Sequence, residues 1–93
     1  MRNYKNWSVS FAYGDRYQAR EGLTKKQAKE VFGKLARDTS TNIHNDYLAL
    51  LILATNGKEI MSMQRVGKGE YSYWNGKKYV PSGYEAAQIV ANL

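Results

Sequence analysis

Hydrophobic and polar residues alternate strictly near the start of the chain, between positions 7 and 13. A period of two is typical of a β-strand that buries one of its faces, so we expect a strand here. Its apolar positions are Trp7, Val9, Phe11 and Tyr13.

The next residues predict a hairpin. Gly14-Asp15 is typical of a turn, and the alternation continues over residues 16–20. A two-residue loop would place Tyr13 opposite Arg16 and mix the two faces of the hairpin. A three-residue loop pairs Tyr13 with Tyr17 and keeps the apolar faces together, so we expect the longer loop.

A helical pattern begins after Leu23. Thr24 and Gln27 have the spacing of a capping box, in which each side chain satisfies a backbone N–H at the helix start. Apolar residues then recur three and four positions apart, which predicts one buried helix face. We expect a helix from Thr24 to about Asp38, followed by a polar turn over residues 39–45. The apolar set is Ala28, Val31, Phe32, Leu35 and Ala36.

A long apolar run from Tyr47 to Thr55 predicts a strand that is buried on both faces and therefore central in a sheet. Asn56-Gly57 favours a type I′ turn, whose two central residues need positive φ, and Lys58 to Val66 is the expected partner strand. A regular hairpin then pairs Ile52 with Met61, on the face that we expect to meet the helix. The same register pairs Leu50 with Met63.

The C-terminal third predicts one more hairpin and a short helix. Residues 70–74 and 77–80 flank Asn75-Gly76, a second type I′ signal. Ser82 and Glu85 have capping-box spacing ahead of four apolar residues at helical intervals. These four are Ala86, Ile89, Val90 and Leu93.

The resulting order ββ-α-ββ-ββ-α predicts a single α+β domain over residues 1–93. We expect a mostly antiparallel sheet of five to six strands, with one main helix packed on one face and a short C-terminal helix.

Composition removes several kinds of chemistry. The 93 residues include no cysteine and one histidine, which excludes disulfides, thiol catalysis and cysteine-ligated metals. His44 lies in a polar loop without a second ligand at metal-site spacing, and no phosphate-loop or nucleophile-elbow motif is present. We therefore expect a protein that is not an enzyme and that uses no cofactor or metal.

The chain also predicts a cytoplasmic protein without a membrane partner. No apolar stretch of signal-peptide length follows Met1. The longest apolar run, Leu48 to Ala54, has seven residues, far fewer than the ~20 that span a bilayer.

The chain is basic, with 14 Lys and Arg against 8 Asp and Glu and a net charge of +6. Five cations gather on the polar side of the first predicted helix, although Lys25 and Lys29 repel each other and lysines at a helix start oppose its dipole. Two interpretations remain open: a solvated helix face, and a site for a polyanion such as nucleic acid. The five are Lys25, Lys26, Lys29, Lys34 and Arg37.

Aromatic and basic residues also gather around the last predicted hairpin. Such a surface can stack on exposed bases while its cations meet phosphates. The same composition is typical of cross-strand pairs that stabilise a hairpin, and of surfaces that bind proteins, so three interpretations remain open. The residues are Lys68, Tyr71, Tyr73, Trp74, Lys77, Lys78 and Tyr79.

These features predict a small non-enzymatic binding module for nucleic acid or a nucleoprotein, acting through the basic helix face and the aromatic hairpin. In type, a small, basic, tyrosine-rich and cysteine-free chain resembles accessory proteins of phages and mobile elements. That resemblance implies the alternative function, inhibition or modulation of a host protein by direct binding. Exposed strand edges leave a homodimer open as well.

Overall fold

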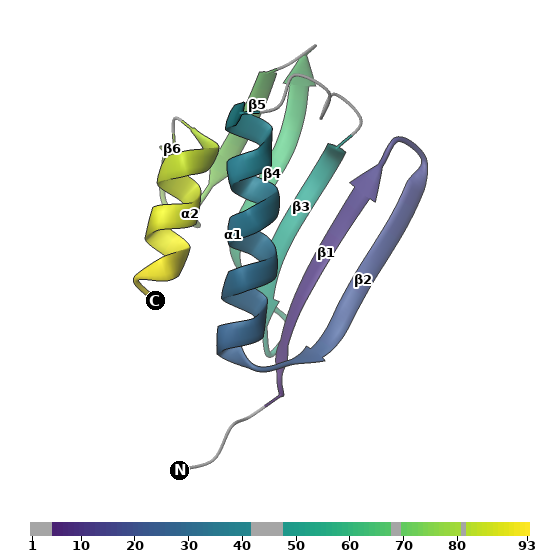
Figure 1. The fold of residues 1–93 in the computed structure, drawn as a ribbon, viewed down its shortest axis with the longest axis vertical. Helices are drawn as coiled ribbons and strands as arrows, with labels where there is room; N and C mark the ends of the chain where they lie inside the picture. Colours follow the sequence, from purple (N-terminus) through teal and green to yellow (C-terminus); the bar gives the residue numbers. More distant parts are fainter. Residues whose placement is uncertain (1–4, 42–47, 68–69, 81) are drawn as a thin grey trace.

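The computed structural model describes residues 5–41, 48–67, 70–80 and 82–93. They form a single α+β domain with one six-stranded antiparallel sheet in the order β2-β1-β3-β4-β5-β6 (Figure 1). The predicted fold class is confirmed, and β3 lies inside the sheet as expected. The elements are β1 (Trp7–Tyr13), β2 (Arg16–Leu23), α1 (Lys25–Thr41), β3 (Leu48–Thr55), β4 (Lys58–Gly67), β5 (Glu70–Trp74), β6 (Tyr79–Val80) and α2 (Gly83–Ala91).

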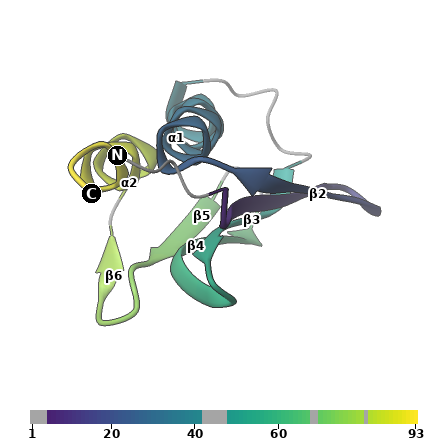
Figure 2. The same ribbon diagram turned by 90° about the horizontal axis from the view of Figure 1, so that it is seen from below.

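Both helices lie on the same side of the sheet, and they pack against each other (Figure 2). Among the described residues no helix covers the opposite side, which is called the open face below. The sheet edge formed by β2 is exposed along almost its whole length, because α1 and α2 lie over the other strands.

The core lies between the sheet and the two helices. The apolar side of α1 supplies Phe32, and α2 supplies Val90, both with 0% exposure. The predicted apolar face of α1 is therefore confirmed. The strand residues buried beneath the helices are Val9, Phe11, Leu48, Leu51, Leu53, Met61, Met63, Tyr73 and Val80.

The caps of both helices form as predicted. The backbone N–H of Thr24 donates to Gln27 Oε1 at 2.9 Å, and the N–H of Gln27 donates to Thr24 Oγ1 at 3.2 Å. At α2, the N–H of Glu85 donates to Ser82 Oγ at 3.2 Å. These bonds satisfy N–H groups that have no partner inside the helix.

Two details of the helices differ from the prediction. Helix α1 continues to Thr41, one turn beyond the expected end at Asp38, because neither glycine nor proline interrupts it there. In α2, Ala86 and Val90 are buried, whereas Ile89 and Leu93 are 36% and 39% exposed. The rest of the predicted 39–45 turn, with His44, lies outside the described residues.

The first hairpin has the two-residue loop, so the predicted three-residue loop is wrong. Tyr13 lies opposite Arg16, and Ala12 lies opposite Tyr17. Gly14 has φ +60°, which suits the first position of a tight hairpin turn. A register that aligns the apolar residues of β1 and β2 gains little free energy here, because β2 is exposed and buries little of either face.

The second hairpin has the predicted turn but not the predicted register. Asn56 and Gly57 have φ of 53° and 76°, as a type I′ turn requires. An irregularity in the pairing between Leu53 and Ala54 then shifts the strands by one residue. Leu53 consequently lies opposite Met61, and it is the side of Leu51 and Leu53, not the side of Leu50 and Ile52, that faces the helices.

The third hairpin has a longer loop than the predicted type I′ turn. Trp74 lies opposite Tyr79, so residues 75–78 form the connection. The side chain of Asn75 holds this loop: its Oδ1 accepts from the backbone N–H groups of Lys77 and Lys78, both at 2.9 Å. An asparagine side chain that accepts from backbone N–H groups two and three residues later offers an alternative to the two-residue turn. Tyr73 shares one face of this hairpin with Val80, and Trp74 shares the other face with Tyr79.

We expect the ionisation of Tyr13 to lower the stability of the protein in alkali. Burial raises the pKa of its phenol above the ordinary 10.0, and the charge of Asp38 raises it further. The native state therefore holds this proton more tightly than the unfolded chain. Below pH 10 the difference has no effect, whereas above it the unfolded state ionises first and the free energy of unfolding falls until the native pKa is passed.

Tyr13→Phe removes this contribution while keeping the ring. We expect urea denaturation between about pH 8 and 11 to show a steeper loss of stability in the wild type than in the variant. The two proteins differ only in this hydroxyl group, so the difference between their curves isolates Tyr13. Parallel curves would contradict the prediction.

Candidate polyanion-binding groove

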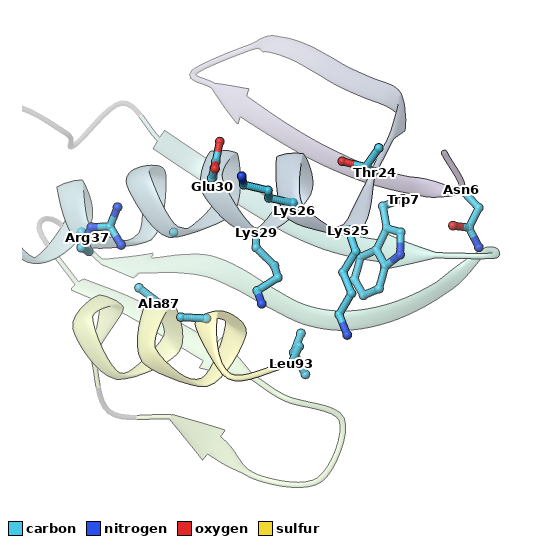
Figure 3. A pocket seen from close by; sticks show the side chains of 12 residues that line it. Asn6, Trp7, Thr24, Lys25, Lys26, Lys29, Glu30, Arg37, Ala87 and Leu93 are labelled. Carbon is cyan, nitrogen blue, oxygen red and sulfur yellow. The ribbon is translucent and has the colours of Figure 1, made fainter. Parts of the chain in front are cut away.

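A groove of about 850 Å³ opens between α1, α2 and the start of β1 (Figure 3). Four of its lining residues are basic, and Glu30 is the one acidic residue among them. The basic residues are Lys25, Lys26, Lys29 and Arg37. Four of the five cations predicted on the helix therefore line this groove.

The helical repeat explains how α1 builds its wall of the groove. Lys25, Lys29, Gly33 and Arg37 are spaced four residues apart, so they form one row along the helix. Gly33 is buried and leaves a gap in that row. A Cβ atom at this position would lie 3.1 Å from Nη1 of Arg37, so the guanidinium lies over the glycine.

The side chains of α1 do not all point the same way. In Figure 3, Lys25 and Lys29 extend from α1 toward Leu93 at the end of α2, whereas Lys26 and Glu30 project from the other side of the helix. Lys25 and Lys29 are therefore the central cations of the groove. Lys34, the fifth predicted cation, is exposed outside it.

Trp7 closes one end of the groove, and sequence reasoning did not select it as a site residue. Its indole is half-buried, packs against the core and lies beside Lys25 in Figure 3. The alternating pattern placed Trp7 on the buried face of a strand. No sequence signal indicated that this strand end would meet α1.

The backbone next to Trp7 is tied to the neighbouring hairpin. The carbonyl of Asn6 accepts from the N–H of Asn56 at 3.3 Å and from the Thr55 hydroxyl at 3.3 Å. The Asn6 amide Nδ2 also donates to Asn56 Oδ1 at 2.9 Å. These bonds hold the indole on a fixed part of the sheet.

The predicted aromatic cluster is divided between two faces of the sheet. Tyr73 is 1% exposed and its hydroxyl donates to the Ala36 carbonyl at 3.5 Å, so its ring belongs to the core. Tyr71 packs partly against the same core. Neither ring is placed to stack on a ligand at the hairpin surface.

Trp74 and Tyr79 lie on the open face, away from the helices. Their ring centroids are 4.8 Å apart at 61°, and they are 38% and 70% exposed. Lys77 and Lys78 are exposed in the adjoining loop, and Lys68 lies outside the described residues. The hairpin and the groove are therefore separate surfaces.

Charged strand residues also separate by face. Paired residues in antiparallel strands share a face, so pairing of Arg20 with Val9 places Arg20 on the helix side, and pairing of Glu59 with Ala54 places Glu59 on the open face. The same reasoning assigns the other charges. Arg16, Lys58 and Arg65 lie on the helix side, and Glu70 lies on the open face. Positive charge thus accumulates on the side that carries the groove.

Two features were sought in the described residues: clusters of metal-ligating side chains and membrane-spanning helices. The described residues contain no group of three or more His, Cys, Asp or Glu side chains that could hold a metal ion. No helix in the described ranges is both long enough and apolar enough to cross a membrane.

No family model, curated protein or solved structure matches the chain. The fold and the groove therefore carry the functional argument: a small α+β domain with one basic groove beside its main helix.

Proposed function

We propose that this protein is a non-enzymatic nucleic-acid-binding module that holds a phosphodiester backbone in the groove between α1 and α2. The observation that supports the proposal is the concentration of Lys25, Lys29 and Arg37, with Lys26, in a single concavity that contains one acidic residue. Phosphate neutralisation by such cations supplies most of the free energy of non-specific nucleic-acid binding.

The dimensions of the row suit a chain of phosphates. From Lys25 to Arg37 the helix rises by roughly 18 Å, at 1.5 Å per residue. Each strand of a B-form duplex carries one phosphate per ~3.4 Å of helix axis, and the spacing along an extended single strand is wider, so the row is long enough to meet several successive phosphates. Arg37 adds a planar guanidinium that can bind two phosphate oxygens at once.

The test is a titration of labelled oligonucleotides of about ten nucleotides, followed by fluorescence anisotropy at several salt concentrations. Four phosphate contacts predict a slope of about −3 for log K against log salt with single strands. Lys25→Gln with Lys29→Gln is expected to weaken binding by roughly tenfold at ~50 mM salt and to make the slope shallower by about 1.

A matched control distinguishes the effect of the groove on affinity from the effect of net charge. Lys77→Gln with Lys78→Gln removes the same two charges from the exposed loop 75–78 and is expected to change the affinity little. Absence of binding at ~50 mM salt, where phosphate contacts are strongest, would overturn the proposal. Equal losses in the two double variants would overturn the assignment to the groove.

A second candidate function, binding of a host protein, is favoured by the open face. The solvated face of an antiparallel sheet is normally polar, yet here Leu50 and Ile52 are only half-buried and the Trp74–Tyr79 pair is exposed. The acidic residues Glu59 and Glu70 lie on the same face. This chemistry suits a protein whose own apolar surface is bordered by basic side chains.

Paired variants on opposite sides of the molecule test the second candidate. Trp74→Ser with Tyr79→Ser is expected to abolish capture of a stoichiometric protein partner. Tyr84→Ser, which removes a ring from a residue of α2 that is 51% exposed, is expected to leave capture intact. A partner retained by the double variant would contradict this function. Sedimentation of the purified protein would reveal whether the partner is a second copy.

A further inference from the structure

We infer that the groove selects single-stranded over duplex nucleic acid, with Trp7 as the platform on which one base stacks while Lys25 and Lys29 bind the neighbouring phosphates. This inference rests on the proposed function and adds the class of nucleic acid that the site accepts.

The two walls of the groove differ in chemistry. The α1 wall carries the cations, whereas the α2 wall is formed by Ala87, Ala91 and Leu93. A single strand has the same asymmetry, with a charged backbone on one side and apolar base faces on the other. A duplex presents phosphates on its outer surface and would leave the apolar wall without a partner.

Trp7 is placed to contact a base at the end of this groove. It lines the groove together with Lys25, and its backbone belongs to β1, which is paired with β2 at Leu23 and with β3 at Thr55. Pairing on both sides fixes the backbone that carries the indole. Bases within a duplex are already stacked on both faces, whereas the bases of a single strand can move onto an aromatic side chain.

The size of the groove agrees with this choice. Its volume of about 850 Å³ lies within the ~300–1,000 Å³ that is typical of sites for small ligands. A groove of this size can enclose a nucleotide or two of a flexible strand, but it cannot enclose the paired bases of a rigid double helix.

The positions of the two tryptophans provide a direct test. The chain has two tryptophans, so Trp74→Phe leaves Trp7 as the sole fluorescent indole. The substitution lies on the open face, whereas Trp7 lies on the helix side of the sheet. The probes are an oligothymidylate of about ten nucleotides and a G·C-rich hairpin with a stem of about ten base pairs, which stays paired at low salt. We expect the single strand to quench Trp7 fluorescence and to bind at least tenfold more tightly than the duplex.

Variants at position 7 then separate stacking from folding. Trp7→Ala is expected to weaken single-strand binding by roughly 5- to 100-fold with little effect on duplex binding. Trp7→Phe keeps an aromatic ring and should recover part of the loss. Circular dichroism of each variant checks that the fold is intact, and the Phe variant remains informative if the Ala variant unfolds.

The outcomes distinguish this inference from the proposed function. Equal affinities for single strand and duplex, or binding seen by anisotropy without quenching of Trp7, would overturn the inference and leave the proposed function standing. Absence of binding to either probe at ~50 mM salt would overturn both.

Discussion

Replacement of Phe32 by alanine is expected to lower the free energy of unfolding by about 3–5 kcal/mol. The side chain has 0% exposure and lies on α1 where this helix packs over β1 and β3. Its removal leaves a cavity that α1, which packs against both α2 and the sheet, cannot close. Since a domain of this length is stable by roughly 5–14 kcal/mol, the loss takes away a large share of the total.

Urea denaturation followed by circular dichroism measures this loss directly. Phe32→Leu, which keeps most of the volume, is expected to cost less than ~1.5 kcal/mol. The leucine variant remains measurable if the alanine variant does not fold. A loss below ~1.5 kcal/mol for Phe32→Ala would show that the helices do not press on the sheet at this point.

The second large effect is a contrast between two neighbouring leucines of β3. Leu51 is fully buried beneath the helices, whereas Leu50 is half-buried on the open face. Leu51→Ala should therefore cost about 2–5 kcal/mol, and Leu50→Ala about 1 kcal/mol, because a partly exposed side chain leaves less of a cavity.

The two variants are matched in chemistry and differ only in the face of the strand. The same urea titration compares them. If Leu50→Ala were the more costly substitution, the assignment of Leu51 to the helix side of β3 and of Leu50 to the open face would be wrong.

Local elements of this fold could be predicted because their causes lie within a few residues. The reciprocal bonds of Thr24 and Gln27 join residues three positions apart, so the start of α1 is visible in the sequence. The positive φ values of Asn56 and Gly57 follow from the preferences of those two residues. The cationic row of α1 follows from the helical repeat.

Strand register was less predictable, since it depends on partners far along the chain. A single irregularity between Leu53 and Ala54 places Met61 and Met63 opposite Leu53 and Leu51, whereas a regular hairpin would place them opposite Ile52 and Leu50, and nothing in the turn indicates it. The predicted loop length of the first hairpin was wrong for a related reason. Apolar matching sets register where one face of a strand is buried, and β2 lies at an edge that the helices leave uncovered.

The candidate functional surfaces also include features that the sequence shows and features that only the tertiary structure shows. From the sequence alone follow a net charge of +6, a basic side on α1 and an aromatic hairpin. The tertiary structure alone decides that Tyr73 belongs to the core and that Trp7 shares a groove with Lys25. The physical reason is distance along the chain. A helix repeats every 3.6 residues whatever surrounds it, but the groove exists only where β1, α1 and α2 pack together.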